Sequence, residues 1–297
     1  MKLIAEDGHV YSAKKGFLQI GKTDGKVRPE RMGVADASTF PGFCNHHDTA
    51  MFEPVESNDA ALTERNAFLL SFRALCYELA TKQAVLRISE HSRHRLDRGV
   101  PYKRQVGLQT FFFFRDVAFR KSMGELTKVK TLYDAAYLTD DLSPFRFYGL
   151  TFDTVLPFVG AGALMPVSDF LGNQLQRLDD GSAAEILTLN VTTIGGQTVL
   201  VMGWIGSATG PAEKLVASFA ALPDDRKADA ILELALVHLE NVYLRPSWWS
   251  GLAPDVREGL DSKIGFHVSA TPGSRALLGD MVMDVLSAGV ASTIEKR

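Results

Sequence analysis

Residues 186–206, ILTLNVTTIGGQTVLVMGWIG, constrain the fold of this chain more than any other segment. Two runs rich in apolar and β-branched residues meet at Gly195-Gly196, and a glycine pair between such runs is typical of a β-hairpin with a two-residue turn. Residues 145–156 have the same strand-like composition. We therefore expect the sheet of this protein to be mostly antiparallel.

The helices that we expect from apolar spacing lie before and after these strands. Residues 60–87 carry apolar side chains three and four positions apart, which predicts a helix. The other predicted helices span residues 107–137, 211–222, 224–244, 253–263 and 274–296. Within the first of these, the aromatic run at residues 111–114 could equally form a buried strand, and we favour the helix. Because helices and strands come in blocks and do not alternate regularly, the expected fold class is α+β.

The N-terminal part is expected to form a small module of its own. A β-hairpin is predicted over residues 9–20, and Asp48 is expected to cap a short helix that ends near Pro54. The expected organisation is a finger-like module at residues 1–56, a helical region at 57–142 and an α+β lobe at 143–297.

Composition narrows the class of protein. Hydrophobic residues make up 46% and charged residues 23% of the 297 residues, which is typical of a globular chain. Cys44 and Cys76 are too few for a disulfide framework, so we expect a reducing compartment and a cytoplasmic location. The sequence has no signal peptide pattern and no uninterrupted apolar stretch of membrane-spanning length, so no membrane partner is expected.

Chemistry-bearing residues are concentrated in residues 43–56, FCNHHDTAMFEPVE. Cys44 and His47 have the Cys-x2-His spacing that forms half of a tetrahedral zinc site. The candidates for completing the site are His9, His46, Asp48, His91 and His94. In the alternative interpretation the turn is purely structural: Cys44 is a small buried hydrophobe, His47 and Asp48 cap a helix, and Glu56 faces solvent.

The same segment carries a resemblance to a known group of proteins. The pattern FC-x2-HD-x3-F-x-PVE, followed by RALC-x-E-x2-TK at residues 73–82, resembles a family of uncharacterised bacterial proteins. Looser matches follow in FD at residues 152–153, P-x2-DF at 166–170, LQ at 175–176 and EN-x4-P-x-WW at 240–249. The matches span most of the chain, but this family implies no function.

The N-terminal pattern is also similar to HNH-type nucleases, the His-Me finger group. This resemblance implies a divalent metal, zinc or magnesium, held near Cys44, His47 and Asp48, with Glu56 in support. His47, Asp48 and His9 are then the catalytic candidates, His9 taking the role of general base. The cysteine pair and base histidine that usually precede such a motif are absent, so the module is expected to be truncated or degenerate.

A second candidate segment is basic. Residues 87–104, RISEHSRHRLDRGVPYKR, hold a cluster that could contact the phosphates of a nucleic acid: Arg93, Arg95, Arg98, Lys103 and Arg104. A solvated helix end followed by a loop has the same composition, and charge patterning favours that interpretation. The aromatic run at residues 111–114 is expected in the core rather than as a platform for base stacking. Trp248 and Trp249 are expected to pack against the body of the protein.

Two hypotheses about function follow. The first is a metal-dependent, nucleic-acid-processing protein of HNH type. The second is a non-catalytic interaction or regulatory component of a bacterial defence or stress system, which binds a protein partner and in which the Cys-His turn is structural.

Overall fold

The structure, a computed structural model, describes residues 1–12, 28–37, 42–57, 59–178, 181–264 and 285–297. Its helices are η1 (Lys2–Ile4), α2 (Asn45–Glu56), α3 (Glu64–Arg93), α4 (Tyr102–Thr139), α5 (Pro211–Ala220), α6 (Asp224–His238), α7 (Pro246–Gly251) and α8 (Pro254–Ile264). Its strands are β1 (His9–Ser12), β2 (Glu30–Gly33), β3 (Phe145–Phe152), β4 (Phe158–Leu164), β5 (Leu187–Ile194), β6 (Gln197–Ile205), β7 (Val242–Leu244) and β8 (Val290–Lys296).

The strands described by the structure form one sheet in the order β2-β1-β7-β4-β5-β6-β3-β8. Every pairing between these strands is antiparallel. The expected α+β class is therefore confirmed. The predicted division at residues 56 and 142 stays a prediction, and β1 of the first segment pairs with β7 of the last.

The hairpin predicted at the glycine pair is confirmed. Ile194 pairs with Gln197 across the turn, and Gly195 and Gly196 have φ angles of 57° and 81°. Positive φ at both turn positions is the conformation that two-residue hairpins need and that glycine adopts without a steric penalty. Only β1 of the hairpin predicted over residues 9–20 is described; it pairs with β2, and residues 13–20 lie outside the described part of the chain.

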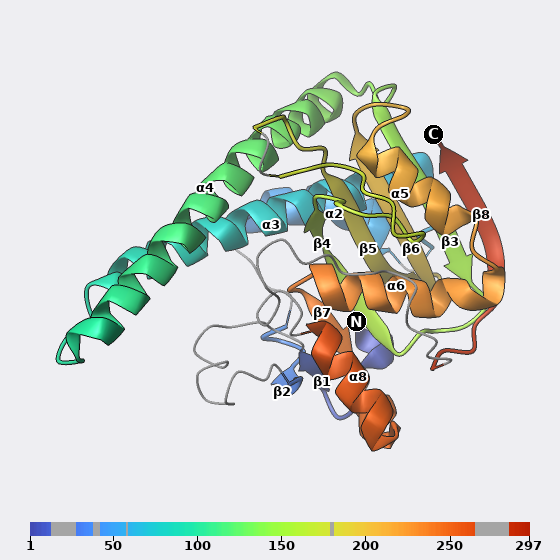
Figure 1. Ribbon diagram of the computed structural model, residues 1–297. Coiled ribbons are helices and arrows are strands. Elements are labelled where there is room, and N and C mark those ends of the chain that lie inside the picture. Colours follow the sequence, from blue (N-terminus) through green and yellow to red (C-terminus); the bar gives the residue numbers. More distant parts are fainter. Residues whose placement is uncertain (13–27, 38–41, 58, 179–180, 265–284) are drawn as a thin grey trace.

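Helices cover both faces of the sheet (Figure 1). On one face, α2, α3 and part of α4 pack on side chains such as Val199 and Val201. On the other face, α5 and α6 pack on side chains such as Leu200 and Met202. Successive residues of β6 thus serve opposite cores, as the alternation of side chains along a strand requires.

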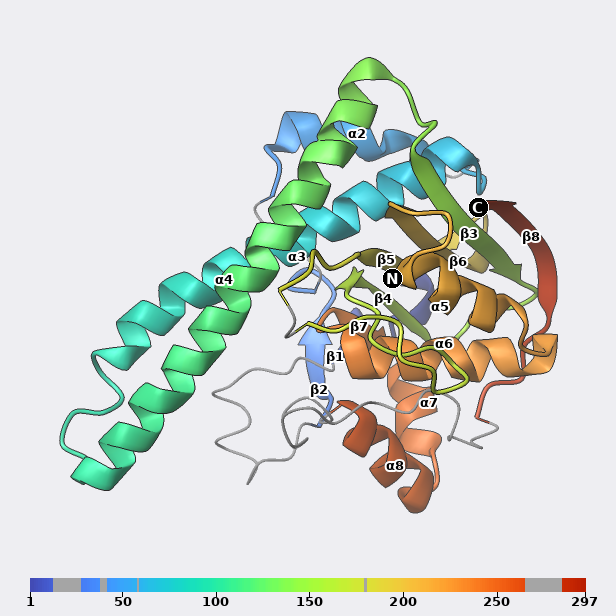
Figure 2. The same cartoon turned by 45° about the horizontal axis from the view of Figure 1, so that its top comes forward.

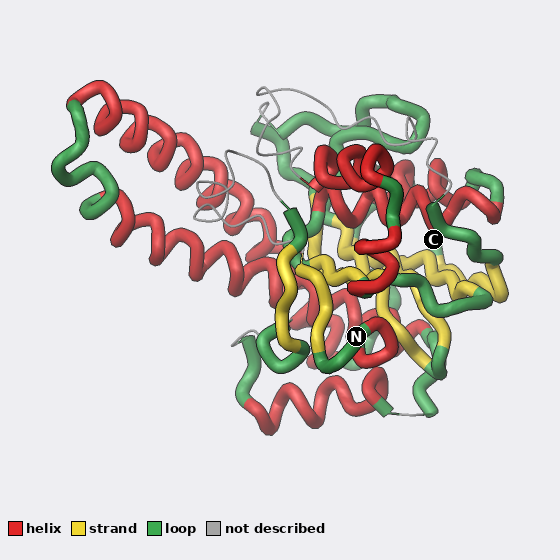
Figure 3. The backbone as a smooth tube through the Cα atoms, turned by 90° about the horizontal axis from the view of Figure 1, so that it is seen from below, coloured by secondary structure: helices red, strands yellow, loops and turns green. Residues whose placement is uncertain are grey.

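The two longest helices extend beyond the sheet. The distal parts of α3 and α4 run side by side as a projection that leaves the body of the molecule (Figures 1 and 2), and the view from below shows the same projection (Figure 3). We define the arm as residues 87–120. Its connecting turn is held by Gln109, which donates to the carbonyl oxygen of Arg93 at 2.9 Å and to the carboxylate of Asp97 at 2.8 Å.

Several predicted element boundaries are wrong. Cys44, rather than Asp48, is the N-cap of α2, and Pro54 lies inside that helix. The helix expected over residues 224–244 ends at His238, since Val242–Leu244 joins the sheet as β7. The end of the helix expected over residues 274–296 is strand β8, which pairs with β3; residues 274–284 are not described. β-Branched residues within Val290–Lys296 suit this strand.

Two further expectations concern packing and membranes. Trp249 is buried and Trp248 packs against the same core, as predicted. Among the described helices, none combines the length and the low charge that a membrane-spanning segment needs.

Candidate functional site

The Cys-His turn lies at the start of α2. Cys44 has the extended backbone of an N-cap residue, and the first helical turn brings His47 back toward it. The Sγ atom of Cys44 lies 3.1 Å from Nδ1 of His47, and both side chains are exposed. The sequence prediction that the two side chains converge is confirmed, whereas the expected burial of Cys44 in the structural interpretation is wrong.

No third ligand joins this pair among the described residues, where no group of three or more histidine, cysteine, aspartate or glutamate side chains is arranged to hold a metal ion. His9 lies on β1, where its Nδ1 is 2.6 Å from the carbonyl oxygen of Asp7 and 3.2 Å from the guanidinium of Arg31. His91 and His94 lie at the far end of α3, on the arm. Metal binding at Cys44 therefore stays a prediction.

The acidic residues of the motif are fixed by an arginine of α3. Arg73 donates to Asp48 at 3.1 Å and to Glu56 at 2.5 Å, and its guanidinium lies 4.7 Å from the ring centroid of Phe52. One cation thus faces two carboxylates, and the three side chains are about a third to a half exposed. This ion-pair group ties α2 to α3, which explains why the PVE and RALC parts of the sequence motif lie together.

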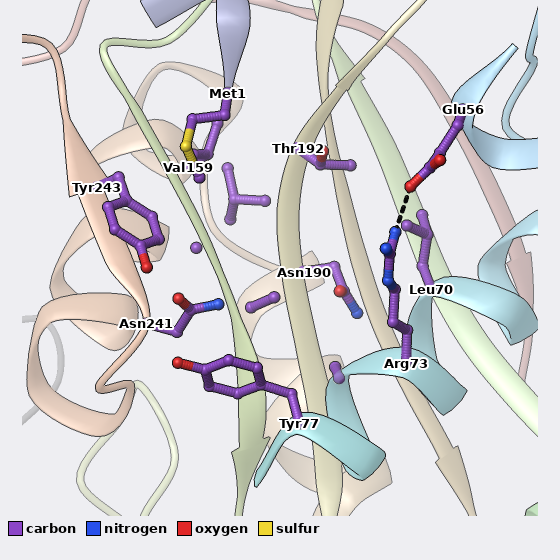
Figure 4. Close-up of a pocket in the computed structure, with 14 residues that line it drawn as sticks. Met1, Glu56, Leu70, Arg73, Tyr77, Val159, Asn190, Thr192, Asn241 and Tyr243 are labelled. Carbon is purple, nitrogen blue, oxygen red and sulfur yellow. Dashed lines mark hydrogen bonds and ion pairs between the residues drawn. The ribbon is translucent and has the colours of Figure 1, made fainter. Parts of the chain in front are cut away.

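A pocket of about 320 Å³ opens beside this ion-pair group (Figure 4). Helix α3 forms one wall, and strands β4 and β5 with the start of β7 form the other. Glu56 and Arg73 lie at one side of the pocket, and Tyr77 projects into it from the next turn of α3 (Figure 4).

The sheet wall of the pocket has a simple cross-strand order. Ala161 of β4 pairs with Asn190 of β5, and its N–H donates to the carbonyl oxygen of Asn241 on the other side. One small residue therefore stands between two asparagines on neighbouring strands. In the next row, Val159 pairs with Tyr243. Because the side chain of Ala161 is only a methyl group, the space between the two asparagines that a longer side chain would fill stays open.

Both asparagines are almost completely buried, with exposed fractions of 3% for Asn190 and 4% for Asn241. Within the described part of the chain, Nδ2 of Asn190 and Oδ1 of Asn241 have no hydrogen-bond partner. Burial raises the pKa of the Tyr77 hydroxyl well above its usual range, and the neighbouring Tyr243 adds to the shift. The end of the pocket lined by Asn190, Asn241 and Tyr77 therefore holds uncharged polar groups in a desolvated setting.

Sequence reasoning did not find the pocket, although one signal was present. Asn190 interrupts the apolar run of residues 186–194, and an asparagine inside a buried strand needs a reason because it is unfavourable there. Asn241 belongs to the EN-x4-P-x-WW pattern, but a single sequence gives it no role.

The predicted phosphate-binding residues lie at the arm and are mostly exposed. Exposed basic side chains are found at six positions of the arm: Arg87, Arg95, Arg98, Lys103, Arg104 and Arg120. Arg93 differs, since it is partly buried and donates to Gln109 at 3.2 Å. Its side chain stabilises the end of the arm, so it is less accessible to a phosphate than the six exposed basic side chains are.

The aromatic run of the arm is largely outside the core, contrary to expectation. Phe112 is buried, whereas Phe111, Phe113 and Phe114 are 44%, 56% and 66% exposed. The physical reason is that the run is helical, so its four rings point in different directions and only one can face α3. Phe113 and Phe114 contact each other edge to face at a centroid distance of 5.5 Å.

The fold and these surfaces define an α+β protein with an antiparallel sheet, a helical arm and a polar pocket. Comparisons with protein-family models, with curated proteins and with solved structures found no match.

Proposed function

We propose that this chain binds single-stranded nucleic acid and that the arm is its binding surface. The observation that carries the proposal is the combination of exposed basic and exposed aromatic side chains on one projecting element. Proteins that bind single strands use cationic groups along the backbone and aromatic rings on which bases stack.

Charge supports this assignment. Residues 87–120 contain eight arginines and lysines and three aspartates and glutamates, a formal charge of +5 in a chain whose net charge is −3. The positive charge is therefore local, and it would attract a polyanion to the arm rather than to the body.

The aromatic side chains support a single strand in particular. Tyr102 is 80% exposed at the start of α4, and Phe113 and Phe114 follow about three turns later. Exposed apolar side chains that gather on one surface often mark a site that a partner covers. The bases of a single strand expose their faces and can stack on such rings, whereas the bases of a duplex are already stacked.

Oligonucleotide binding measured by fluorescence anisotropy tests the proposal. The wild-type protein should bind a labelled single-stranded 20-mer at low salt. The double substitution Phe113→Ala and Phe114→Ala should weaken binding by about tenfold or more, because each stacked base contributes about 1–3 kcal/mol. Leu138→Ala is the matched control, since Leu138 is 80% exposed on the same helix but lies outside the arm. A protein that binds no single strand at low salt contradicts the proposal.

A second candidate function rests on the spacing of exposed apolar residues along α4. Tyr102, Val106, Phe113 and Val117 are all exposed and lie four, seven and four residues apart, which places them on one stripe of the helix. Such a stripe suits an amphipathic helix of a protein partner, with acidic flanks to match the arm. The double substitution Val106→Ser and Val117→Ser should weaken the binding of a helical protein partner. It should change the affinity for an oligonucleotide by no more than about twofold.

Cleavage of a bound strand is a separate matter. It requires the metal predicted at Cys44, His47 and Asp48, and the ion pair of Asp48 with Arg73 favours a structural role for that carboxylate. The binding proposal does not depend on catalysis.

A further inference from the structure

The pocket beside α3 carries an inference that is independent of the arm. We propose that it is a binding site for an uncharged, nucleoside-sized molecule with a planar ring that carries both a hydrogen-bond donor and an acceptor. The volume of about 320 Å³ lies at the small end of the range for ligand pockets, which suits one ring and one sugar.

The two buried asparagines define the polar recognition. Nδ2 of Asn190 is a donor and Oδ1 of Asn241 is an acceptor, and neither atom has a partner among the residues that the structure describes. Since most buried polar groups in proteins are paired, two unpaired amides on the wall of one pocket indicate a missing partner. Because both atoms are buried, the two amides have to turn toward the pocket before a ligand that offers an acceptor to Asn190 and a donor to Asn241 can satisfy them.

The charges around the pocket indicate that the ligand is neutral. Two positively charged groups belong to lining residues: Arg73, which is paired with both Asp48 and Glu56, and the amino group of Met1, whose pKa is lowered by burial so that its neutral form is favoured. A phosphate or carboxylate would have to displace one of these partners, and a cation would have to approach the guanidinium. Neutral hydrogen-bonding groups avoid both costs.

The remaining walls suit the flat part of such a ligand. Tyr77 and Tyr243 present rings at the end of the pocket that holds Asn241, and Leu70 and Val159 supply apolar surface (Figure 4). An aromatic heterocycle that presents both a donor and an acceptor, as nucleobases do, combines the two requirements.

Isothermal titration calorimetry with uridine, cytidine, adenosine and guanosine tests the inference, with ribose alone as the control for the sugar. At least one nucleoside should bind the wild-type protein, and its 5′-monophosphate should bind no more tightly. Asn190→Leu and Asn241→Leu should each weaken binding by about tenfold or more, because each removes one hydrogen bond. Asn173→Leu, an asparagine outside the pocket, should bind as the wild type does.

The melting temperatures of the same variants distinguish loss of ligand binding from loss of folding. Replacing an unpaired buried amide by an apolar group of similar shape should leave the melting temperature equal or higher, so loss of binding cannot be attributed to unfolding. The inference is overturned if no nucleoside binds at millimolar concentration, which would leave water as the partner of the amides. The inference is also overturned if the nucleoside still binds to both leucine variants. A lower melting temperature in both leucine variants overturns it too, because that result would assign the amides a structural role.

Discussion

Arg73 is the residue at which the two parts of the N-terminal sequence motif, residues 43–56 and 73–82, meet in space. Its pairs with Asp48 and Glu56 link the first and last turns of α2 to the third turn of α3. The same guanidinium covers the ring of Phe52, a buried residue of α2. A single side chain thus orients the Cys-His turn relative to the polar pocket.

The metal content of the protein decides between the two interpretations of that turn. If Cys44 and His47 bind an ion, protein purified without chelator should contain close to one zinc or other divalent ion per chain. The content should fall in Cys44→Ala and in His47→Ala, because each removes a ligand. His94→Ala, a histidine on the arm, should leave the metal content unchanged. A folded, metal-free wild-type protein would rule the metal interpretation out.

Cys76 gives a prediction about pH. Burial in the core that α3 and α4 share raises the pKa of this thiol from 9.0 to about 11. The unfolded chain therefore loses its thiol proton at a lower pH than the folded chain does, so the folded state loses stability as pH rises from about 9 to 11. The cost reaches about 2 kcal/mol at the upper end.

Denaturant unfolding at several pH values measures this effect. The fall in unfolding free energy above pH 9 should be smaller in Cys76→Ala than in the wild type. Cys44→Ala should retain the wild-type pH dependence, because that cysteine is exposed. Equal slopes for the wild type and Cys76→Ala would show that the Cys76 thiol does not govern the pH dependence.

At the scale of elements, the arm has a polar anchor of its own between its two helices. Ser89 donates to the carboxylate of Asp116 at 2.6 Å, both residues are buried, and Arg115 lies 3.5 Å from the same carboxylate. We expect Asp116→Ala to destabilise the arm by about 1–3 kcal/mol, because Ser89 is left buried without its partner.

Hydrogen exchange locates that loss. Backbone amides of the arm, residues 87–120, should exchange faster in Asp116→Ala, while the amides of β5 and β6 should keep their protection. Glu125→Ala serves as the control, since its partner Lys128 is 67% exposed and such a pair contributes little. Faster exchange across the sheet would show that the arm does not open independently.

The elements also show what a single sequence can predict. The β5–β6 hairpin and helix α3 were predicted because turn glycines and apolar spacing are local signals. Strand β8 was not, because its pairing with β3 joins residues far apart in the chain. Its 290–296 segment is mostly exposed at the sheet edge, so it lacks the strong apolar alternation of a central strand.

Candidate sites were predicted unevenly for the same reason. Cys44 and His47 lie three residues apart, so their proximity follows from a local turn. The pocket instead joins α3, β4, β5 and β7, and only the completed fold brings Asn190 and Asn241 to either side of Ala161. The exposure of Phe113 also depends on which face of α4 meets α3, which composition does not specify.

At the scale of the whole molecule, charge is separated between the arm and the body. The arm carries a formal charge of +5, and the residues outside it contain 24 basic and 32 acidic side chains. A polyanion is therefore attracted to one end of the molecule and repelled by the other. This separation, together with the exposed rings, is the physical basis of the proposed nucleic-acid binding.

The salt dependence of single-strand affinity tests this central claim most directly. Each phosphate contact should contribute about −0.7 to the slope of log affinity against log salt concentration. The double variant Arg95→Ala and Arg98→Ala should therefore flatten the slope by about 1.4. Lys214→Ala, an exposed lysine on α5, should leave the slope unchanged. Absence of binding at low salt, or a slope that the two arginine substitutions do not change, would contradict the account.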